Sequence, residues 1–367
     1  MRVALDYRPA TVAPSSGIGR QVKALEESLL ERGDTELVLF SEAPLDHPQR
    51  LSAVCPPWTS PLDGLQRPQV RLRFERKFLP AALREHTIDL YIATANMGLP
   101  LGHKPAGTRY VLILHDLFQL TQNNFHRSKT KALAYRMIDA ASIAWSIWIA
   151  DEVWCPSRYS CNEAVRLFPW AKPKVRVLNN LVPEYQDEPG ALPEGLPERY
   201  WLVVGTREPR KNMAFFVENW HACRREHPSV PPLVLVGHAS DLPAELAGLP
   251  GLYWVNGVSD AQLHALYVHA QCLWQPSYAE GFGLPVIEAL SVGTPVAVAR
   301  GSALDEVAPP SARRFGAHDR AQLKAALINQ AEDETPADTQ ALRDWARKFD
   351  GPAYRYRLDT LLRALYR

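Results

Sequence analysis

The chain has 367 residues, a length that predicts two domains of ordinary size. Hydrophobic residues make up 46% and charged residues 22%, and 41 Lys plus Arg against 40 Asp plus Glu give a net charge of +1. This composition is typical of a globular protein with a sizeable core. It argues against a disordered chain and against a partner such as nucleic acid bound through overall charge.

The chain start and the cysteines exclude further classes of protein. The sequence has no run of about 18 apolar residues, and its first residues, MRVALDYRP, reach Asp6 and Arg8 too early for a signal peptide. We therefore expect a cytoplasmic protein. The cysteines are odd in number, scattered and free of C-x-x-C spacing, so neither a disulfide framework nor a zinc site is predicted. They are Cys55, Cys155, Cys161, Cys223 and Cys272.

Short apolar runs alternate with stretches of helical period along the whole chain, which predicts an α/β fold with parallel sheets. The runs expected as strands are Arg2–Asp6, Glu36–Phe40, Leu90–Ala93, Val111–Leu114, Glu152–Cys155, Val175–Leu178, Val203–Val204 with its neighbours, Leu233–Val236, Leu252–Val255, Cys272–Gln275 and Pro295–Ala299. The stretches expected as helices include Gly19–Arg32, Asp260–His269, Leu284–Val292 and Tyr354–Tyr366.

A change of composition at Val182–Arg199 divides these elements into two groups. The segment VPEYQDEPGALPEGLPER holds four prolines, two glycines and five acidic residues, which is typical of a linker. We therefore expect a Rossmann-like domain over residues 1–182, a second one over residues 183–345 and a cleft between them. The helical pattern within residues 346–367 leaves open which domain that segment contacts.

Basic residues gather in the N-terminal half. Residues 66–86 contain six Lys or Arg against two Glu, and the longer stretch 66–136 has a net charge of +8, so the rest of the chain carries −7. The apolar residues within or near the stretch are Trp58, Phe74, Phe78 and Leu79. This mixture suits an anionic membrane surface or a lipid diphosphate, and a solvated basic face is the alternative.

Residues Tyr278–Leu290, YAEGFGLPVIEAL, combine two carboxylates with a glycine turn. Glu280 follows a predicted strand, and Glu288 lies eight positions later within the next predicted helix. The turn Gly281–Gly283 leaves backbone N–H groups free at a helix entrance, where an anion is favoured. Carboxylates at such a site can accept hydrogen bonds from sugar and ribose hydroxyls.

Residues Leu202–Met213, LVVGTREPRKNM, place three cations directly after a strand. Arg207, Arg210 and Lys211 follow Gly205 within six positions, at the strand end where α/β folds bind ligands. A diphosphate is the natural partner of such a cluster. An exposed basic loop is the alternative.

Two further segments in the N-terminal half carry candidate residues. Gly17 and Gly19, in APSSGIGR, precede a helix and allow close approach of a phosphate or sugar. The fingerprint G-x-G-x-x-G is not completed, because position 22 is Val, which argues against a nicotinamide cofactor. In VLILHDL, His115 follows an apolar strand and would face the crevice, with Asp116 able to fix its tautomer. A packed histidine is the alternative.

Together these segments resemble glycosyltransferase family 4, whose members are retaining enzymes of the GT-B fold. The most specific part is PSYAEGFGLPVIEALSVGTPV with its E-x7-E pair, and SGIGR, LHDL, CPSRYS, VLNNLVPEY, GTREPRKN and NGVSDAQLHALYVHA accompany it over nearly the whole chain. The resemblance implies an N-terminal acceptor domain and a C-terminal donor domain across a cleft. It also implies a final helix that crosses back to the N-terminal domain.

The resemblance assigns the nucleotide-sugar donor to the second domain. Glu288 would bind the donor's ribose, and Glu280 would hold the transferring sugar. Lys211, with Arg210 or Arg207, would clamp the diphosphate. The backbone of Gly281, Phe282 and Gly283 would help to hold the sugar. Leu284 would also bind the donor, and the backbone of Val258 would border the base.

From the first domain, His115 would contact the donor sugar, and Gly17 and Gly19 would lie near the diphosphate and the acceptor. Glu280, Lys211 and His115 are the expected catalytic residues. A leaving-group oxygen would take the acceptor's proton, so no protein base is required. The sequence has no D-x-D motif, so neither a metal nor another cofactor is expected.

The resemblance implies sugar transfer to a glycan acceptor, linked to polyprenyl diphosphate or another carrier, in O-antigen or exopolysaccharide synthesis. GDP-mannose or GDP-rhamnose is favoured as donor, because LHDL and GTREPRKN resemble the variants in mannosyl- and rhamnosyltransferases. Residues 66–86 would hold the enzyme at the inner face of the cytoplasmic membrane. Two alternatives stay open: a soluble GT-B synthase that transfers from a UDP- or ADP-sugar to a sugar or sugar phosphate, and an inactive GT-B scaffold.

Overall fold

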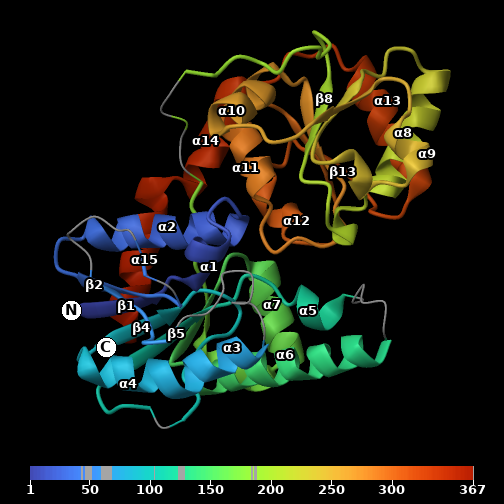
Figure 1. Ribbon diagram of the computed structural model, residues 1–367. Coiled ribbons are helices and arrows are strands. Elements are labelled where there is room, and N and C mark those ends of the chain that lie inside the picture. The colour runs from blue at the N-terminus through green and yellow to red at the C-terminus, as the bar shows by residue number, and fades with distance from the viewer. Residues whose placement is uncertain are drawn as a thin grey trace. The chain divides into compact units, whose positions relative to one another are not determined.

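The computed structural model describes residues 1–42, 44–45, 52–58, 68–102, 104–122, 129–182, 185 and 188–366. The chain forms two compact units, one of Met1–Leu181 with Tyr354–Arg367 and the other of Val182–Ala353. Each unit is built on one parallel sheet with helices on both faces (Figure 1). Parallel strands buried on both faces explain the continuous apolar runs of the sequence.

The first unit has a seven-stranded sheet in the order β3-β2-β1-β4-β5-β6-β7. Its strands are β1 (Arg2–Asp6), β2 (Glu36–Phe40), β3 (Ser52–Val54), β4 (Leu90–Ala93), β5 (Arg109–Ile113), β6 (Glu152–Cys155) and β7 (Val175–Val177). The chain adds β2 and β3 on one side of β1 and then crosses to β4 on the other side. The order therefore reverses between β1 and β4, and α/β sheets bind ligands at the carboxyl ends of such a strand pair.

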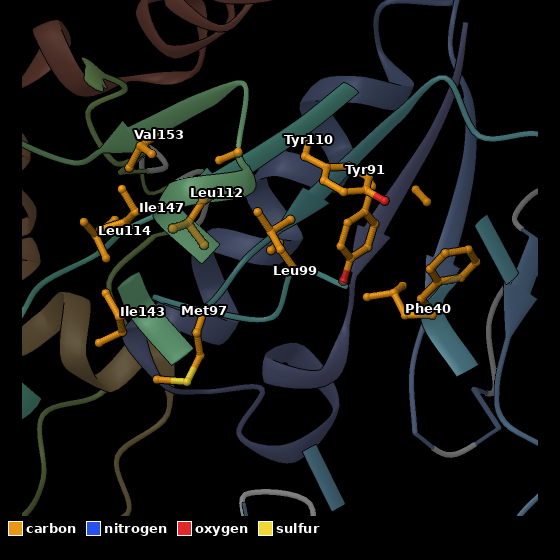
Figure 2. Packing of buried hydrophobic residues seen from close by; sticks show 14 of the residues in the cluster. Phe40, Tyr91, Met97, Leu99, Tyr110, Leu112, Leu114, Ile143, Ile147 and Val153 are labelled. Atoms are coloured by element: carbon orange, nitrogen blue, oxygen red, sulfur yellow. The ribbon is translucent and has the colours of Figure 1, made fainter. Parts of the chain in front are cut away.

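Helices cover both faces of the first sheet because successive strand residues point to opposite sides. One face packs against α1 (Arg8–Val12), α2 (Gly17–Leu30) and α15 (Gly351–Leu365). The other packs against the π-helical η2 (Phe74–Phe78), α4 (Leu79–Glu85), α6 (Lys129–Ile149), α7 (Arg158–Leu167) and η3 (Pro169–Lys174). Figure 2 shows part of this second core, where Tyr91 of β4 lies next to Tyr110 of β5 and near Phe40 of β2, and where Ile143 and Ile147 of α6 also pack. The short helices α3 (Pro68–Arg73) and α5 (Phe118–Thr121) adjoin it.

The second unit has a six-stranded sheet in the order β10-β9-β8-β11-β12-β13, which reverses between β8 and β11. Its strands are β8 (Trp201–Val204), β9 (Leu233–Val236), β10 (Leu252–Val255), β11 (Cys272–Gln275), β12 (Val296–Ala299) and β13 (Arg313–Phe315). One face packs against α8 (Met213–Glu226), α9 (Ala244–Ala247) and α13 (Arg320–Glu332). The other packs against α10 (Asp260–His269), α11 (Leu284–Ser291), α12 (Leu304–Val307) and α14 (Thr339–Ala346).

The parallel α/β class is confirmed, and the structure adds two edge strands that the sequence pattern missed. Strands β3 and β13 are three residues long and read SAV and RRF. Such short, partly polar segments carry no apolar run, because an edge strand borders only one neighbour.

The segment predicted as a linker is packed on the second unit. Tyr185, Leu192 and Leu196 contact its core, and the backbone N–H of Gly190 donates to the carbonyl of Ala261 at 3.0 Å. A Cβ at Gly190 would lie 3.1 Å from Ala261, so glycine is needed for this close approach. The linker interpretation is therefore wrong for the described part of the segment, because apolar residues between the prolines anchor it. Residues 183–184 and 186–187 lie outside the described residues.

The prediction that the apolar residues within or near residues 66–86 face a membrane is also wrong. Phe74, Phe78 and Leu79 belong to the buried core of the first unit, and Trp58 packs against that core. Their spacing is that of a helix face turned toward the sheet, which composition alone cannot distinguish from a membrane face. The exposed side chains of the stretch include the basic Arg73, Arg76, Lys77 and Arg84, together with Leu72 and Glu85. Arg67 and Arg127 lie outside the described residues.

The last helix completes the core of the first unit. Tyr354, Leu358, Leu362 and Leu365 of α15 are buried there together with residues of α2 and the sheet. Ion pairs of Arg355 with Glu31 and of Arg32 with Asp359 join α15 to the end of α2. The first unit therefore depends on the far end of the chain.

Replacing a buried leucine of α15 tests this dependence. Leu358 is 1% exposed, and Leu358→Ala is expected to lower the free energy of unfolding of the first unit by about 2–5 kcal/mol, because the cavity left behind loses packing. Urea unfolding followed by fluorescence measures the change. Tyr356 on the same helix is 76% exposed, so Tyr356→Ala is the matched control. Equal effects of the two substitutions would contradict the role given to α15.

Candidate active site

The two strongest sequence motifs meet at the carboxyl ends of β8 and β11. Residues after β8 form the short helix η4 (Pro209–Lys211), and the carbonyl of Arg210 accepts from the backbone N–H of Tyr278 at 3.0 Å. Asn212 adopts the left-handed conformation with φ 60°. Its Nδ2 donates to the carbonyl of Ala317 at 2.7 Å and approaches that of Pro276 at 3.3 Å. These bonds hold together the loops where the strand order reverses.

Glu280 is the centre of this site. Its Oε1 lies 2.7 Å from Nζ of Lys211, and its Oε2 lies 2.6 Å from a guanidinium nitrogen of Arg210. Oε1 also accepts hydrogen bonds from Gln275 and Ser277, each at 2.9 Å. Burial alone would raise the pKa of the Glu280 carboxyl, but the charges of Lys211 and Arg210 and the hydrogen bonds from Lys211 and Ser277 lower it to about 2. Glu280 is therefore an ionised, buried carboxylate that fixes both cations.

The loop after β8 carries more positive than negative charge. Arg210 also pairs with Glu208 at 2.6 Å, while Arg207 is exposed and forms no ion pair within the described part of the chain. The loop itself thus carries three cations and one carboxylate, while Glu280 and Asp241 lie beside it, Asp241 accepting a hydrogen bond of 2.6 Å from Thr206. Such an excess favours an anionic ligand.

The glycine turn before α11 supplies backbone groups rather than side chains. Gly283 has φ 105°, and a Cβ there would lie 2.6 Å from Leu304, so only glycine fits. No side chain caps the start of α11 at Leu284. Pro285 has no N–H, and the N–H of Val286 donates to the carbonyl of Gly283 at 3.0 Å, so the amide of Leu284 is the one that the helix start can offer to an anion. The ring of Phe282 points into the core against Phe349, with the centroids 5.4 Å apart, and Gly281 is buried beside it.

Glu288 lies on α11 and is 3% exposed. Its Oε2 accepts a hydrogen bond of 2.7 Å from the hydroxyl of Tyr267 on α10. Val258, expected near the base, is half-buried after β10 and packs against the same core. Tyr267 is a residue that sequence reasoning missed, and it orients the carboxylate of Glu288.

His115 belongs to the first unit and follows β5. It is 7% exposed, and its Nε2 lies 2.9 Å from the carbonyl of Thr94, so Nε2 carries the proton and Nδ1 is left as an acceptor. Burial lowers the pKa of His115, against the raising effect of the Thr94 carbonyl, which favours the neutral ring. The expected role of Asp116 in fixing the tautomer is wrong, because Asp116 instead accepts from the backbone of Phe118 at 3.1 Å.

Gly17 and Gly19 lie at the start of α2 in the first unit. The N–H of Gly19 donates to Oγ of Ser16 at 3.0 Å, and a Cβ at Gly19 would lie 2.3 Å from the carbonyl oxygen of Ala13. The N–H of Gly19 thus has a partner in the protein, and its lack of a side chain permits tight packing. Gly17 is exposed at the first position of the helix. Among the described residues, no group of three or more His, Cys, Asp or Glu side chains could hold a metal ion.

Comparison with known proteins shows which families each half of the chain resembles. Residues 15–186 match the family profile described as Glycosyltransferase Family 4, and residues 185–348 match the one described as Glycosyl transferases group 1. The two sheets of the chain are those of the GT-B fold, as the sequence predicts.

Three similar proteins illustrate the relationship. The O-antigen chain mannosyltransferase B of Escherichia coli is 26% identical over 260 residues, 65% of this chain and 65% of that protein. The O-antigen chain mannosyltransferase RfbU of Salmonella typhimurium is 28% identical over 167 residues, 45% of each. Both alignments span less than two thirds of the relative's length. A solved sucrose-phosphate synthase of Thermosynechococcus elongatus has a TM-score of 0.75 at 19% identity, covers 100% of this chain and 99% of that one, and shows the shared fold.

The site contains residues that no motif signalled. Gln275 and Ser277 hold Glu280, and the only signal was a polar residue at the end of the apolar strand CLWQ. Asn96 accepts from the backbone N–H of His115 at 2.7 Å and adopts φ 33°. These contacts link segments far apart in the sequence, so local patterns do not show them.

The low pKa of Glu280 predicts a specific acid sensitivity of the glycosyltransferase. Because the folded-state pKa of about 2 lies below the ordinary value of 4.5, ionised Glu280 stabilises the protein fully above pH 4.5. That stabilisation is lost as the pH falls from 4.5 toward 2. We expect wild type to melt higher than Glu280→Gln at pH 6, with a difference that shrinks on acidification. Melting curves from pH 2.5 to 6 measure it, and a constant difference would contradict the assignment.

Proposed function

We propose that this glycosyltransferase is a retaining mannosyl- or rhamnosyltransferase that uses GDP-mannose or GDP-rhamnose and needs no metal. The acceptor is a hydroxyl of a lipid-linked glycan, carried on polyprenyl diphosphate or a similar anchor, in O-antigen or exopolysaccharide synthesis. The observation that carries the proposal is the ionised Glu280 between Lys211 and Arg210 at the reversal point of the second sheet. The relatives named as O-antigen mannosyltransferases support the choice of sugar and pathway.

The cations act on the leaving group. As the bond between sugar and phosphate breaks, negative charge grows on the diphosphate and positive charge grows on the sugar. Lys211 and Arg210, with the amide of Leu284 at the start of α11, stabilise the diphosphate, and the Glu280 carboxylate positions the sugar. Because Glu280 already orients both cations, little reorganisation is needed when the donor binds. Glu288 holds the donor's ribose through the oxygen atoms that Tyr267 orients.

Retention without a protein base follows from the same arrangement. Glu280 is engaged by four donor groups, which makes it a poor attacking group. A leaving-group oxygen then takes the proton of the acceptor hydroxyl on the face from which the diphosphate departs. Lysine, arginine and a helix start replace the charge that a divalent metal would supply.

Substitutions of the donor-binding residues test this function. Lys211→Ala and Glu288→Ala are each expected to lower kcat/KM at least about a hundredfold, since each removes a charged contact to the donor. Release of nucleotide from GDP-mannose, GDP-rhamnose and UDP- and ADP-sugars measures turnover, with and without EDTA. Lys324→Ala, an exposed cation paired with Glu226, is the matched control.

Each outcome of this assay separates the candidates. Turnover that stays unchanged in Lys211→Ala would contradict the site, and loss of turnover in EDTA would contradict the metal-free mechanism. Turnover only with a UDP- or ADP-sugar would favour the soluble synthase. Absence of turnover with every donor would favour an inactive scaffold.

We also infer that the first unit contacts an anionic membrane surface from the cytoplasm. Within the described part of the chain, no helix is long and apolar enough to cross a bilayer. The exposed cations Arg76, Lys77 and Arg84 supply the electrostatic contact. Apolar contact comes from Met137 and other residues of α6, since Met137 is 65% exposed and α6 is joined to α3 by a hydrogen bond of Arg71 to Ser142.

Charge removal on this surface tests the membrane contact. The triple variant Arg76→Gln, Lys77→Gln, Arg84→Gln is expected to bind phosphatidylglycerol vesicles at least about tenfold more weakly, because each basic residue contributes about 1 kcal/mol near such a surface. Co-sedimentation measures binding. The control triple Arg225→Gln, Arg320→Gln, Lys324→Gln removes equal charge from exposed sites of the second unit. Equal losses in both triples would contradict a specific surface.

A further inference from the structure

A cavity of about 430 Å³ lies in the first unit, where the strand order reverses between β1 and β4. This volume lies in the range of small-ligand sites. The cavity is separate from the donor residues of the second unit described above, because its walls come from α1, the start of α2, the loops after β1 and β4, and α3, α5 and α6 of the first unit. Its polar lining residues include Asp6, Arg8, Arg71, Asn96, Gln119 and Asp139.

A chain of alternating charges forms one wall of this cavity. Arg8 makes two bonds to Asp6, at 2.8 and 2.7 Å, and its guanidinium lies 3.8 Å from Glu75. Arg71 lies 3.8 Å from the same Glu75 oxygen and 3.4 Å from Asp139. Both guanidiniums are thus placed between two carboxyl groups.

This wall offers no unbalanced positive charge. Two guanidiniums face three carboxyl groups, and Arg8 and Arg71 have only 11% and 13% of their side chains exposed. Burial raises the pKa of Glu75 to about 7, against the lowering effects of Arg8 and Arg71. When Glu75 is protonated the wall is neutral, and when it is ionised the wall is negative. A phosphate or diphosphate therefore finds no surplus cation here, in contrast to the loop after β8.

The wall is built into the fold. Gly98 has φ 118°, and a Cβ there would lie 2.9 Å from both Arg8 and Asp6, so the loop after β4 needs glycine to lie against this ion pair. Asn96 of the same loop lines the cavity and also holds the backbone of His115. The cavity is therefore coupled to the expected catalytic histidine through one side chain.

The remaining lining matches an uncharged polyol. Asp139, Asn96 and Gln119 offer carboxylate and amide groups that can accept from and donate to hydroxyls. Val12, Ile18 and Met97 supply apolar surface for the C–H face of a sugar ring. Resting on the proposed function, we propose that this cavity binds the uncharged terminal sugar of the acceptor glycan, with Asp139 and Gln119 as hydroxyl-binding residues. The diphosphate of the lipid carrier lies outside it.

Binding of simple glycosides to the full-length protein tests the proposal. Saturation-transfer NMR is performed with the methyl α-glycosides of mannose, rhamnose, glucose, galactose and N-acetylglucosamine, and with mannose 6-phosphate as the charged comparator. At least one neutral glycoside is expected to bind, and mannose 6-phosphate is expected to bind no more tightly. Asp139→Asn and Gln119→Ala are expected to weaken that neutral glycoside about tenfold, since each removes hydrogen bonds.

Controls separate this proposal from the proposed function. Gln122→Ala, close in sequence but outside the cavity lining, is expected to bind as wild type does, and melting curves check that all variants fold. Failure of every neutral glycoside to bind, tighter binding of mannose 6-phosphate, or binding unchanged in both cavity variants would overturn the proposal. Nucleotide release by wild type from the donor panel is measured in parallel. Absence of nucleotide release would count against the proposed function, whereas the glycoside-binding result tests the cavity proposal by itself.

Discussion

The buried carboxylate of Glu280 is the constraint on which the donor half of the molecule depends. An uncompensated charge in a protein interior costs several kcal/mol, so Glu280 requires Lys211 and Arg210 close by, and they in turn require Glu280. This mutual need fixes the loop after β8 against the loop after β11. Gln275 and Ser277 orient one carboxylate oxygen, and the cations are thereby held at the sheet end where a leaving group gains charge.

The two sheets share a reversal of strand order but differ in the charge balance beside it. Each reverses its strand order once, and each has its ion pairs at the carboxyl ends of the strands flanking that point. In the second unit Arg207 adds a cation beyond those that Glu280 and Glu208 compensate. In the first unit the carboxyl groups around Arg8 and Arg71 leave no excess. The loop after β8 carries a net positive charge and the wall around Arg8 and Arg71 does not, a difference that supports the proposed diphosphate at the first and the proposed uncharged sugar at the second.

The sequence predicted the features that depend on residues close together in the chain. Apolar runs gave the buried strands, and the E-x7-E motif gave Glu280 and Glu288, because a strand, a turn and a helix follow one another there. Partners brought together by the fold were not predictable, such as Thr94 and Asn96 around His115 or Tyr267 beside Glu288. Composition misled at the linker and at the basic stretch, where apolar side chains face the core.

The glycine motif before α2 permits close packing that also shapes the cavity of the first unit. Gly19 lets α2 begin against the carbonyl of Ala13, and its N–H is used by Ser16, which caps the helix. This tight start places Ser16 and Ile18 in the wall of the first-unit cavity, opposite the loop that contains Gly98. Larger residues at either glycine would displace a wall of the same cavity. The need for Gly19 in SGIGR is therefore explained by its close packing against Ala13, which also sets the shape of this cavity.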